Sequence, residues 1–254
     1  SKWMNIGFVH GVMNTDNMTI SGETIDYGPC AFMDSYDPEI VFSSIDIDGR
    51  YSYKNQPAIL IWNLSKLAQT LIPLIDKNEN KAIEKLTEVL QHVMPCYQEY
   101  FYEELGQKLG LEFINKKHII LIKDYLKILK SESIDFTLSF RNLSSILSKS
   151  MTIESSVFVN VNDFKKWIKN WNDEISSKKI NIKDVIKKMD LINPCYIPRN
   201  HIIENALQNS LNGDMSLIDE LMQVYKNPFE EQEKKDLFKK PPETRTQYVT
   251  FCGT

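Results

Sequence analysis

The spacing of hydrophobic and polar positions changes near residue 50. Before it, short apolar stretches such as Ile6–Val9 and Thr24–Tyr27 alternate with polar turns, and four of the nine glycines precede Pro29. This pattern is typical of loops and short strands. From Gln56 onward apolar residues recur at helical spacing, which predicts a mainly helical protein after a loop-rich start.

The helical part divides into several expected helices. The first follows the apolar positions from Ile59 to Leu74, and the second runs from Ile83 toward Leu109 with a break at Pro95. Further helices are expected at about 117–130, 160–176, 182–189, 199–210 and 215–225. The stretch 230–246 is charged and contains prolines, so we expect it to be solvated or loosely docked.

Composition and charge narrow the function classes. The 254 residues carry a net charge of −4, with acids and bases interspersed, which argues against a nucleic-acid-binding protein. Four widely spaced cysteines form no CxxC pair, so we expect neither a zinc ribbon nor a thioredoxin-type motif. Such cysteine usage is typical of a protein in a reducing compartment. We find no signal peptide and no apolar run of membrane-spanning length, and expect a soluble cytoplasmic protein.

One segment carries candidate chemistry: the run from His10 to Asn17, followed nine residues later by Asp-Tyr-Gly at 26–28. In protein kinases a loop of pattern H-R-D-L-x-x-x-N precedes D-F-G, and the Asn and the second Asp bind magnesium. His10 and Asn17 stand at the kinase spacing, but Val12 occupies the position of the catalytic base. The pattern predicts nucleotide and metal binding, with ordinary phosphotransfer in doubt.

The residue types fit a magnesium site. Mg²⁺ prefers oxygen ligands, and Asn17 offers a carbonyl while Asp26 offers a carboxylate. Asp16 is a further carboxylate that could activate an acceptor hydroxyl as a base. The alternative is a turn-forming cluster in which Asn14, Asp16 and Asn17 accept hydrogen bonds from backbone N–H groups. The residue pattern alone leaves both interpretations open.

The runs from His10 to Met18 and from Thr24 to Pro29 resemble the selenoprotein O (YdiU) family of protein adenylyltransferases. Shorter motifs add to the resemblance: Gly49-Arg50-Tyr51, Asn55-Gln56-Pro57, Trp62-Asn63-Leu64, Leu67-Ala68-Gln69, Asn193-Pro194, Arg199-Asn200 and Cys252 near the C-terminus. The stretch from about 76 to 190 is more divergent. The resemblance therefore covers both ends of the chain.

This resemblance implies a mainly α, protein-kinase-like C-lobe with short strands and loops in its N-terminal catalytic segment. It implies three regions: 1–50 with the catalytic loop, the metal-binding motif and an activation-like segment, 51–229 with the helical lobe, and 230–254 with the C-terminal tail. It also implies an enzyme, a nucleotidyltransferase that moves AMP from ATP to Ser, Thr or Tyr hydroxyls of target proteins. No nucleic-acid or membrane partner is implied, and the oligomeric state is left open.

Carried over residue by residue, the resemblance makes Asp16 the proton acceptor. Asn17 and Asp26 become the metal ligands, and Asp26 contacts ATP through the metal. Mg²⁺ is the expected ion, with Mn²⁺ as an alternative. His10 is expected to brace the loop rather than to take part in chemistry.

No phosphate-binding loop is apparent in the sequence. The glycines at 7, 11, 22 and 28 do not follow GxGxxG, and no strand-borne Lys with a helix-borne Glu partner precedes the catalytic loop. The family carries those parts upstream, in an N-lobe. We therefore expect a fragment that binds ATP weakly and is inactive alone.

Two rival functions remain. A catalytically silent pseudokinase scaffold that binds nucleotide or partner proteins is suggested by Val12 and by the missing N-lobe, and an ordinary hydroxyl kinase is the third candidate. Asp16 beside Asn17 and Asp26 favours an enzyme, because a scaffold does not need all three.

The resemblance also suggests redox control. Some members carry selenocysteine near the C-terminus and others a cysteine that can pair with one after the Asp-Tyr-Gly motif. In this sequence the expected partner position falls on Phe42, and the nearest thiol is Cys30. Either Cys30 and Cys252 form a regulatory disulfide, or Cys30 packs as a small apolar residue and Cys252 is a free thiol.

Two further patterns have plainer explanations. Phe164, Trp167 and Trp171 share one face of an expected helix, which is typical of a packing stripe. Asp46, Asp48 and Gly49 hint at a calcium loop, but the first and twelfth positions of that loop would be Ser and Asn. We expect neither to be a functional site.

Overall fold

The structure is a computed structural model that describes residues 1–159, 161–177, 181–243 and 248–250. The described α-helices and strands are, in chain order, α1 (Lys2–Asn5), β1 (Phe8–Val9), β2 (Ala31–Phe32), α2 (Gln56–Ile75), α3 (Glu79–Lys108), α4 (Lys116–Ser131), α5 (Phe136–Leu147), α6 (Asn162–Ser177), α7 (Ile182–Ile192), α8 (Asn200–Leu211) and α9 (Ser216–Val224). Short 3₁₀ helices occur at Thr15–Asn17, Tyr53–Asn55, Ile153–Ser155 and Asp236–Lys239. The expectation of a mainly α protein with short strands in its N-terminal segment is confirmed.

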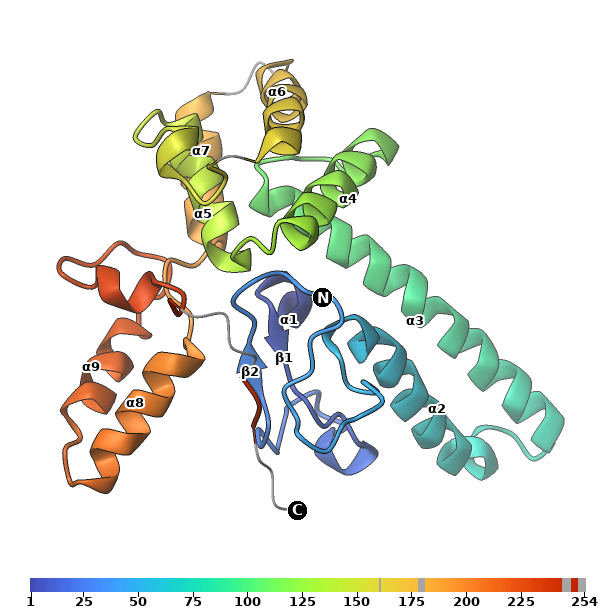
Figure 1. Cartoon of the computed structure of the whole chain (residues 1–254). Helices are drawn as coiled ribbons and strands as arrows, with labels where there is room; N and C mark the ends of the chain where they lie inside the picture. Colours follow the sequence, from blue (N-terminus) through green and yellow to red (C-terminus); the bar gives the residue numbers. More distant parts are fainter. Residues whose placement is uncertain (160, 178–180, 244–247, 251–254) are drawn as a thin grey trace.

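The two strands lie near the middle of the molecule, with groups of helices around them (Figure 1). They pair antiparallel, Phe8 with Phe32 and Val9 with Ala31. Helices α4 to α7 gather on one side and α8 with α9 on another, while α2 and α3 form a long antiparallel hairpin that projects away (Figure 1). The catalytic-loop motif found in the sequence therefore belongs to a central ribbon supported by helices.

The main core is aromatic and is built largely from α3 to α7. Trp167 and Trp171 are 4% and 0% exposed, and their indole N–H groups donate to Leu121 O and Leu109 O, both at 2.8 Å. Burial of such large side chains with satisfied N–H groups is strongly stabilising. The expected packing stripe on α6 is confirmed.

A second, smaller core joins α8, α9 and the tail. It consists of Cys195, Tyr196, Ile202, Ala206, Leu221, Val224 and Phe238. Phe238 is 4% exposed, so the described part of the stretch that we expected to be solvated or loosely docked, residues 230–243, is anchored at this residue. The tail is thereby connected to the body of the protein.

A buried ion cluster connects this smaller core to the ribbon. Arg199 Nη1 donates to Asp34 and to Asp135, both at 2.6 Å, and Nη2 donates to Lys239 O at 2.9 Å. Asp34 follows β2 and Asp135 caps the N-terminus of α5 through Leu138 N. One side chain therefore joins the end of the ribbon, α5 and the tail.

One helix prediction was wrong, and one helix was not predicted. The expected break at Pro95 does not occur, and α3 continues through it. Pro95 and Gln91 are both exposed, so water can bond the carbonyl that loses its helical N–H partner. Helix α5 was not predicted because its serines and Asn142 have low helix propensity, although Asp135 supplies an N-cap.

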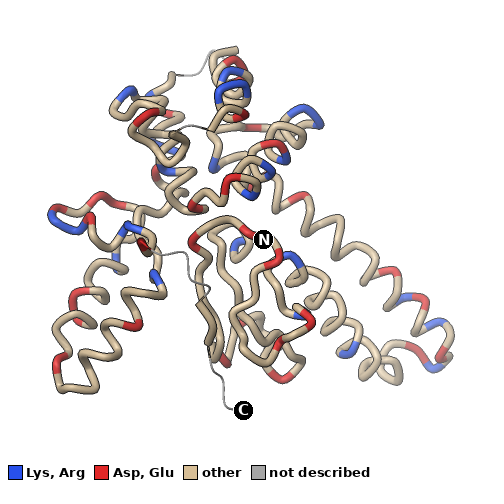
Figure 2. Tube along the Cα trace, in the orientation of Figure 1, with Lys and Arg blue, Asp and Glu red and all other residues tan. Residues whose placement is uncertain are grey.

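Helix α2 departs from a further expectation. Within the described residues, the segment Tyr53–Ile75 is long and apolar enough to cross a membrane, with a mean hydropathy of 1.4, so the expected lack of any such run was wrong. Length and composition alone are weak evidence for a membrane span, because core helices pass the same test. Only 11% of the segment's apolar window is buried, and Figure 2 shows α2 almost free of charge.

Candidate functional site

Residues 10–30 form a long loop between the two paired strands. The ends of this loop are held close together at Gly11 and Pro29. Gly11 has a φ of +87°, and a Cβ there would lie 2.9 Å from both Cγ and O of Pro29. Only glycine meets both conditions without strain, so the backbone requires the glycine that follows His10.

A small hairpin within this loop brings the predicted metal ligands to one end. Met18 pairs with Thr24 in an antiparallel bridge, and Thr19 Oγ1 both accepts from Glu23 N at 3.0 Å and donates to Glu23 O at 2.6 Å. Asn17 directly precedes the first bridge residue and Asp26 lies two residues after the second. The turn between them therefore places both at its open end.

The side chain of Asn17 is oriented by the loop itself. Its Nδ2 donates to Val12 O at 2.9 Å, which leaves Oδ1 as the oxygen available to a ligand. Asp26 is exposed and accepts a hydrogen bond from Gly28 N at 3.0 Å through Oδ1, so its second oxygen is also available. Two oxygen donors with free lone pairs fit Mg²⁺, which is commonly held by one or two protein groups plus phosphate oxygens and water.

Asp16 is exposed, and its carboxylate makes no hydrogen bond with the described residues. The turn-forming alternative for this cluster is wrong. The 3₁₀ helix Thr15–Asn17 has no side-chain cap, and Asn14 Oδ1 accepts from the Tyr51 hydroxyl instead of from a backbone N–H. None of the three side chains therefore accepts a hydrogen bond from a backbone N–H among the described residues, although Asn17 donates one to Val12 O.

Side chains from the start of α2 hold the loop in place. Gln56 is 4% exposed; its Oε1 accepts from His10 N at 3.0 Å and its Nε2 donates to Phe8 O at 2.9 Å. Two turns further along α2, Asn63 Nδ2 donates to Met13 O, three residues after His10, at 2.8 Å. These contacts fix the backbone on both sides of Gly11.

His10 has the bracing role that the sequence suggested. It is 1% exposed, its Nδ1 accepts from Val12 N at 3.3 Å, and its ring stacks on Trp3. Burial lowers the pKa of His10, and the nearby Asp26 opposes that shift. The neutral ring then carries its proton on Nε2, facing away from Val12.

No larger metal cluster is present among the described residues, where no group of three or more His, Cys, Asp or Glu side chains could hold an ion. The calcium-loop alternative also fails in the structure. Asp46 accepts from Arg50 N and Tyr51 N, both at 2.8 Å, and so caps its own loop. A metal site at Asn17 and Asp26 would need ligands from a bound phosphate.

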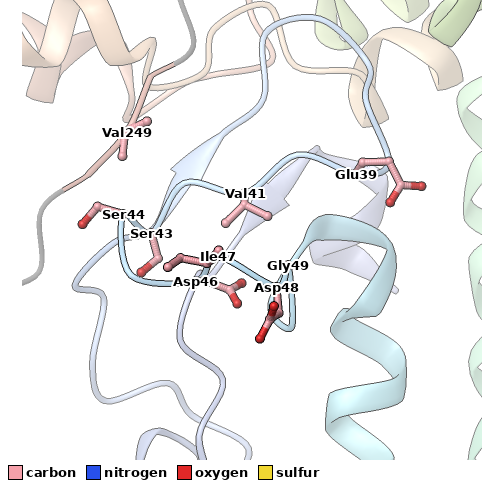
Figure 3. A pocket seen from close by; sticks show the side chains of 9 residues that line it. All are labelled: Glu39, Val41, Ser43, Ser44, Asp46, Ile47, Asp48, Gly49 and Val249. Atoms are coloured by element: carbon pink, nitrogen blue, oxygen red, sulfur yellow. The ribbon is translucent and has the colours of Figure 1, made fainter.

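A hollow of about 400 Å³ lies over the segment after β2 and not over Asp16. Its lining is Glu39, Val41, Ser43, Ser44, Asp46, Ile47, Asp48, Gly49 and Val249. In Figure 3, Asp46 and Asp48 lie close together, between Ser43 and Glu39. The hollow is acidic, which disfavours phosphate binding there.

The cysteine prediction is addressed in part. Cys30 is half-buried and free, its Sγ donates to Tyr27 O at 3.2 Å, and burial raises its pKa. Cys252 lies outside the described residues. The tail nevertheless reaches the segment where the family's second cysteine was expected, because Thr250 N donates to Phe42 O at 2.7 Å.

Sequence reasoning assigned no role to the loop-holding residues Gln56, Asn63 and Tyr51, although all three lie in motifs that carried the resemblance. The available signal was a polar residue on an otherwise apolar helix face. Gln56 and Asn63 are the two buried polar residues of α2, at positions where an apolar residue would be expected. A buried amide needs a partner, and here the partner is the catalytic-loop backbone.

Comparison with known proteins identifies the family and relatives of this chain. A family model described as Protein adenylyltransferase SelO matches residues 1–226. Proteins named Protein nucleotidyltransferase YdiU from Maridesulfovibrio salexigens and Lachnoclostridium phytofermentans are 43% and 41% identical over 256 residues, covering 100% of this chain and 52% of each relative. The relative of the same name from Clostridium botulinum is 43% identical, with 100% and 51% covered.

The chain thus spans about half the length of the curated relatives it matches. The resemblance inferred from the His10–Met18 and Thr24–Pro29 runs is confirmed. Because the family model matches residues 1–226 of the 254 in this chain, the chain belongs to the SelO family of protein adenylyltransferases.

Proposed function

We propose that this chain is the catalytic and metal-binding part of an enzyme that transfers AMP from ATP to Ser, Thr or Tyr hydroxyls of target proteins. The observation that carries the proposal is the gathering of Asp16, Asn17 and Asp26 at one end of a hairpin, with the Asn17 carbonyl left free by the Val12 contact. The name of the relatives, protein nucleotidyltransferase, supports the reaction class. The surrounding helices act as a kinase-like C-lobe.

Asn17 and Asp26 would hold Mg²⁺, or Mn²⁺ in its place. When bound, the ion neutralises charge that develops on the phosphates during transfer. Asp16 accepts the proton of the acceptor hydroxyl while the hydroxyl oxygen forms a bond to the α-phosphorus. The bond from that phosphorus to the bridging oxygen breaks, and pyrophosphate leaves.

Asp16 suits the role of base because its exposed carboxylate has no hydrogen-bond partner among the described residues. Val12 stands at the position where kinases place the catalytic base, and a valine side chain cannot accept a proton. His10 is also a poor base, because it is buried and its Nδ1 already accepts from Val12 N. The proton acceptor is therefore a different residue of the same loop.

The test uses a longer protein, in which this chain is joined to the part of its relatives that the chain does not cover. It is incubated with target protein and ATP labelled at the α- or the γ-phosphate. Label from the α position alone is expected, and Asp16→Asn should abolish it while leaving ATP binding intact. Label from the γ position alone would make the protein a kinase, and ATP binding with no transfer would favour the scaffold.

A disulfide between Cys30 and Cys252 is proposed as a regulator of this activity. It is supported by the tail segment at Thr250, whose N–H donates to Phe42 O at 2.7 Å in the segment that follows Cys30 and β2. Peptide mapping after mild oxidation tests the pairing: Cys252 left free, or joined only to another chain, would contradict it.

A further inference from the structure

We infer that Arg50, Trp62 and Lys66 form a recognition site for an acidic side chain of the target protein, close to the acceptor hydroxyl. This inference rests on the proposed function and names the chemistry of its protein substrate. The three residues come from the end of the segment after β2 and from α2. They are called the Arg50 cluster below.

The charge pattern makes this cluster unusual. Between Lys2 and Lys54, Arg50 is the one Lys or Arg, whereas the same stretch holds eight Asp and Glu residues. Lys66 is the one charged residue of α2. An arginine among so many carboxylates would be expected to pair with one of them.

Neither cation has such a partner. Among the described residues, Arg50 and Lys66 form no ion pair and no side-chain hydrogen bond. Both instead lie against one indole ring: Arg50 Cζ is 4.7 Å and Lys66 Nζ 5.2 Å from the ring centroid of Trp62. Trp62 is itself 40% exposed, Arg50 is exposed and Lys66 is half-buried, so a ligand can reach the cluster from solvent.

Cation–π contacts leave the hydrogen-bonding capacity of both cations unused. A guanidinium over an aromatic ring still presents its N–H donors in its own plane, where they can bind a carboxylate in bidentate fashion. A second positive charge on the same ring strengthens the field for an anion and repels a cation. The geometry therefore selects a carboxylate, with Arg50 as donor and Lys66 as supporting charge.

The cluster is attached to the catalytic loop at two points. Tyr51, next to Arg50, donates its hydroxyl proton to Asn14 Oδ1, two residues before Asp16. Asn63, next to Trp62, donates to Met13 O at 2.8 Å. A target segment with its hydroxyl at Asp16 would pass this cluster within a few residues, since an extended chain advances about 3.3 Å per residue.

The carboxylates around the cluster suggest what its positive charge does. Asp16 and Asp26 repel an acidic target segment, and the hollow lined by Glu39, Asp46 and Asp48 adds to that repulsion. The cations of the Arg50 cluster, which have no ion-pair partner among the described residues, supply the compensating positive charge. An acidic residue near the hydroxyl is thus attracted to one place and repelled elsewhere, which sets the register of the target.

The test measures peptide binding to this chain without nucleotide, so its outcome does not depend on AMP transfer. Fluorescein-labelled peptides carry one Tyr flanked either by Glu or, in the matched peptide, by Gln, and fluorescence anisotropy gives their affinities. We expect tighter binding of the Glu peptide, with a preference that falls as salt is raised. Arg50→Gln and Lys66→Gln should each weaken the Glu peptide about two- to fivefold, the range for an exposed ion pair.

Lys81→Gln is the matched control, because Lys81 is an exposed lysine of α3 that forms no ion pair among the described residues. It should leave both affinities unchanged. Equal binding of the two peptides, or the same loss in Lys81→Gln as in the cluster variants, would overturn the inference. If Arg50→Gln and Lys66→Gln weakened the binding of ATP but not of the Glu peptide, the two cations would belong to the nucleotide site. That result would also overturn the inference.

Discussion

Gln56 and His10 are joined across the start of the catalytic loop: Gln56 Oε1 accepts from His10 N at 3.0 Å. The other end of the same amide donates to Phe8 O at 2.9 Å. One side chain at the start of α2 thereby satisfies the backbone of β1 and of the loop that follows. Because His10 N–H and Phe8 C=O are buried, water cannot replace these hydrogen bonds if Gln56 is substituted.

Gln56→Leu should therefore destabilise the chain by about 2–4 kcal/mol, the cost of leaving a buried N–H and a buried C=O without partners. Urea unfolding followed by circular dichroism measures the change. Gln69→Leu, at an exposed position of the same helix, is the control and should stay within about 0.5 kcal/mol of wild type. Equal effects of the two changes would show that the Gln56 contacts contribute little.

Gly11 and Gly22 offer a matched pair. Both have positive φ, +87° and +79°, but a Cβ at Gly11 meets Pro29 at 2.9 Å while one at Gly22 meets nothing within 4 Å. Gly22→Ala should cost about 1 kcal/mol for the backbone conformation alone. Gly11→Ala should cost about 1–3 kcal/mol more because the two ends of the loop must separate. Similar unfolding free energies for the two variants would contradict the close approach.

The metal site is tested in the longer protein that joins this chain to the remaining half of its relatives. Asp26→Ala should lower AMP transfer about a hundredfold or more and weaken Mg²⁺-dependent nucleotide binding, because it removes the carboxylate ligand. The fold should persist, since Asp26 is exposed. Asp48→Ala, an exposed carboxylate outside the loop, serves as the control. Normal transfer by Asp26→Ala at ordinary Mg²⁺ would exclude Asp26 as a ligand.

Lys108 should give the stability an unusual pH dependence. It is 2% exposed, its Nζ donates to Asn5 O, and it lies 4.2 Å from the ring centroid of Phe140. Burial lowers the pKa of Lys108 to about 7, an effect that Glu104 partly opposes. Between about pH 7 and the ordinary lysine value near 10.5, the unfolded chain binds more protons than the folded one.

Stability should consequently rise with pH across that window, by at most about 1.4 kcal/mol per pH unit from this one group. Lys108→Met should remove this contribution, so the difference between wild type and variant should change from pH 7 to pH 9. Lys130→Met, at an exposed position on α4, should retain the wild-type slope. Parallel curves for wild type and Lys108→Met would mean that the buried amine titrates as it does in the unfolded chain.

Local patterns in the sequence were enough to determine the helical part of the chain. Helices α4, α6, α7, α8 and α9 lie within a few residues of their predicted ranges, because their apolar stripes recur at 3.6-residue spacing. Local rules failed at Pro95 and at α5. An exposed carbonyl can tolerate a proline, and burial of Phe136, Phe140 and Leu143 outweighs the low propensity of their polar neighbours.

The identity of the candidate site residues was also contained in the sequence, because Asp16, Asn17 and Asp26 stand at recognisable spacings. Their arrangement was not. The free oxygen of Asn17 depends on the Val12 carbonyl, and the loop geometry depends on Gln56 and Asn63, which lie some 40 to 50 residues further along the chain. Such contacts between distant residues form only when the helices pack, so tertiary structure alone decided which polar atoms are consumed by the fold and which face a ligand.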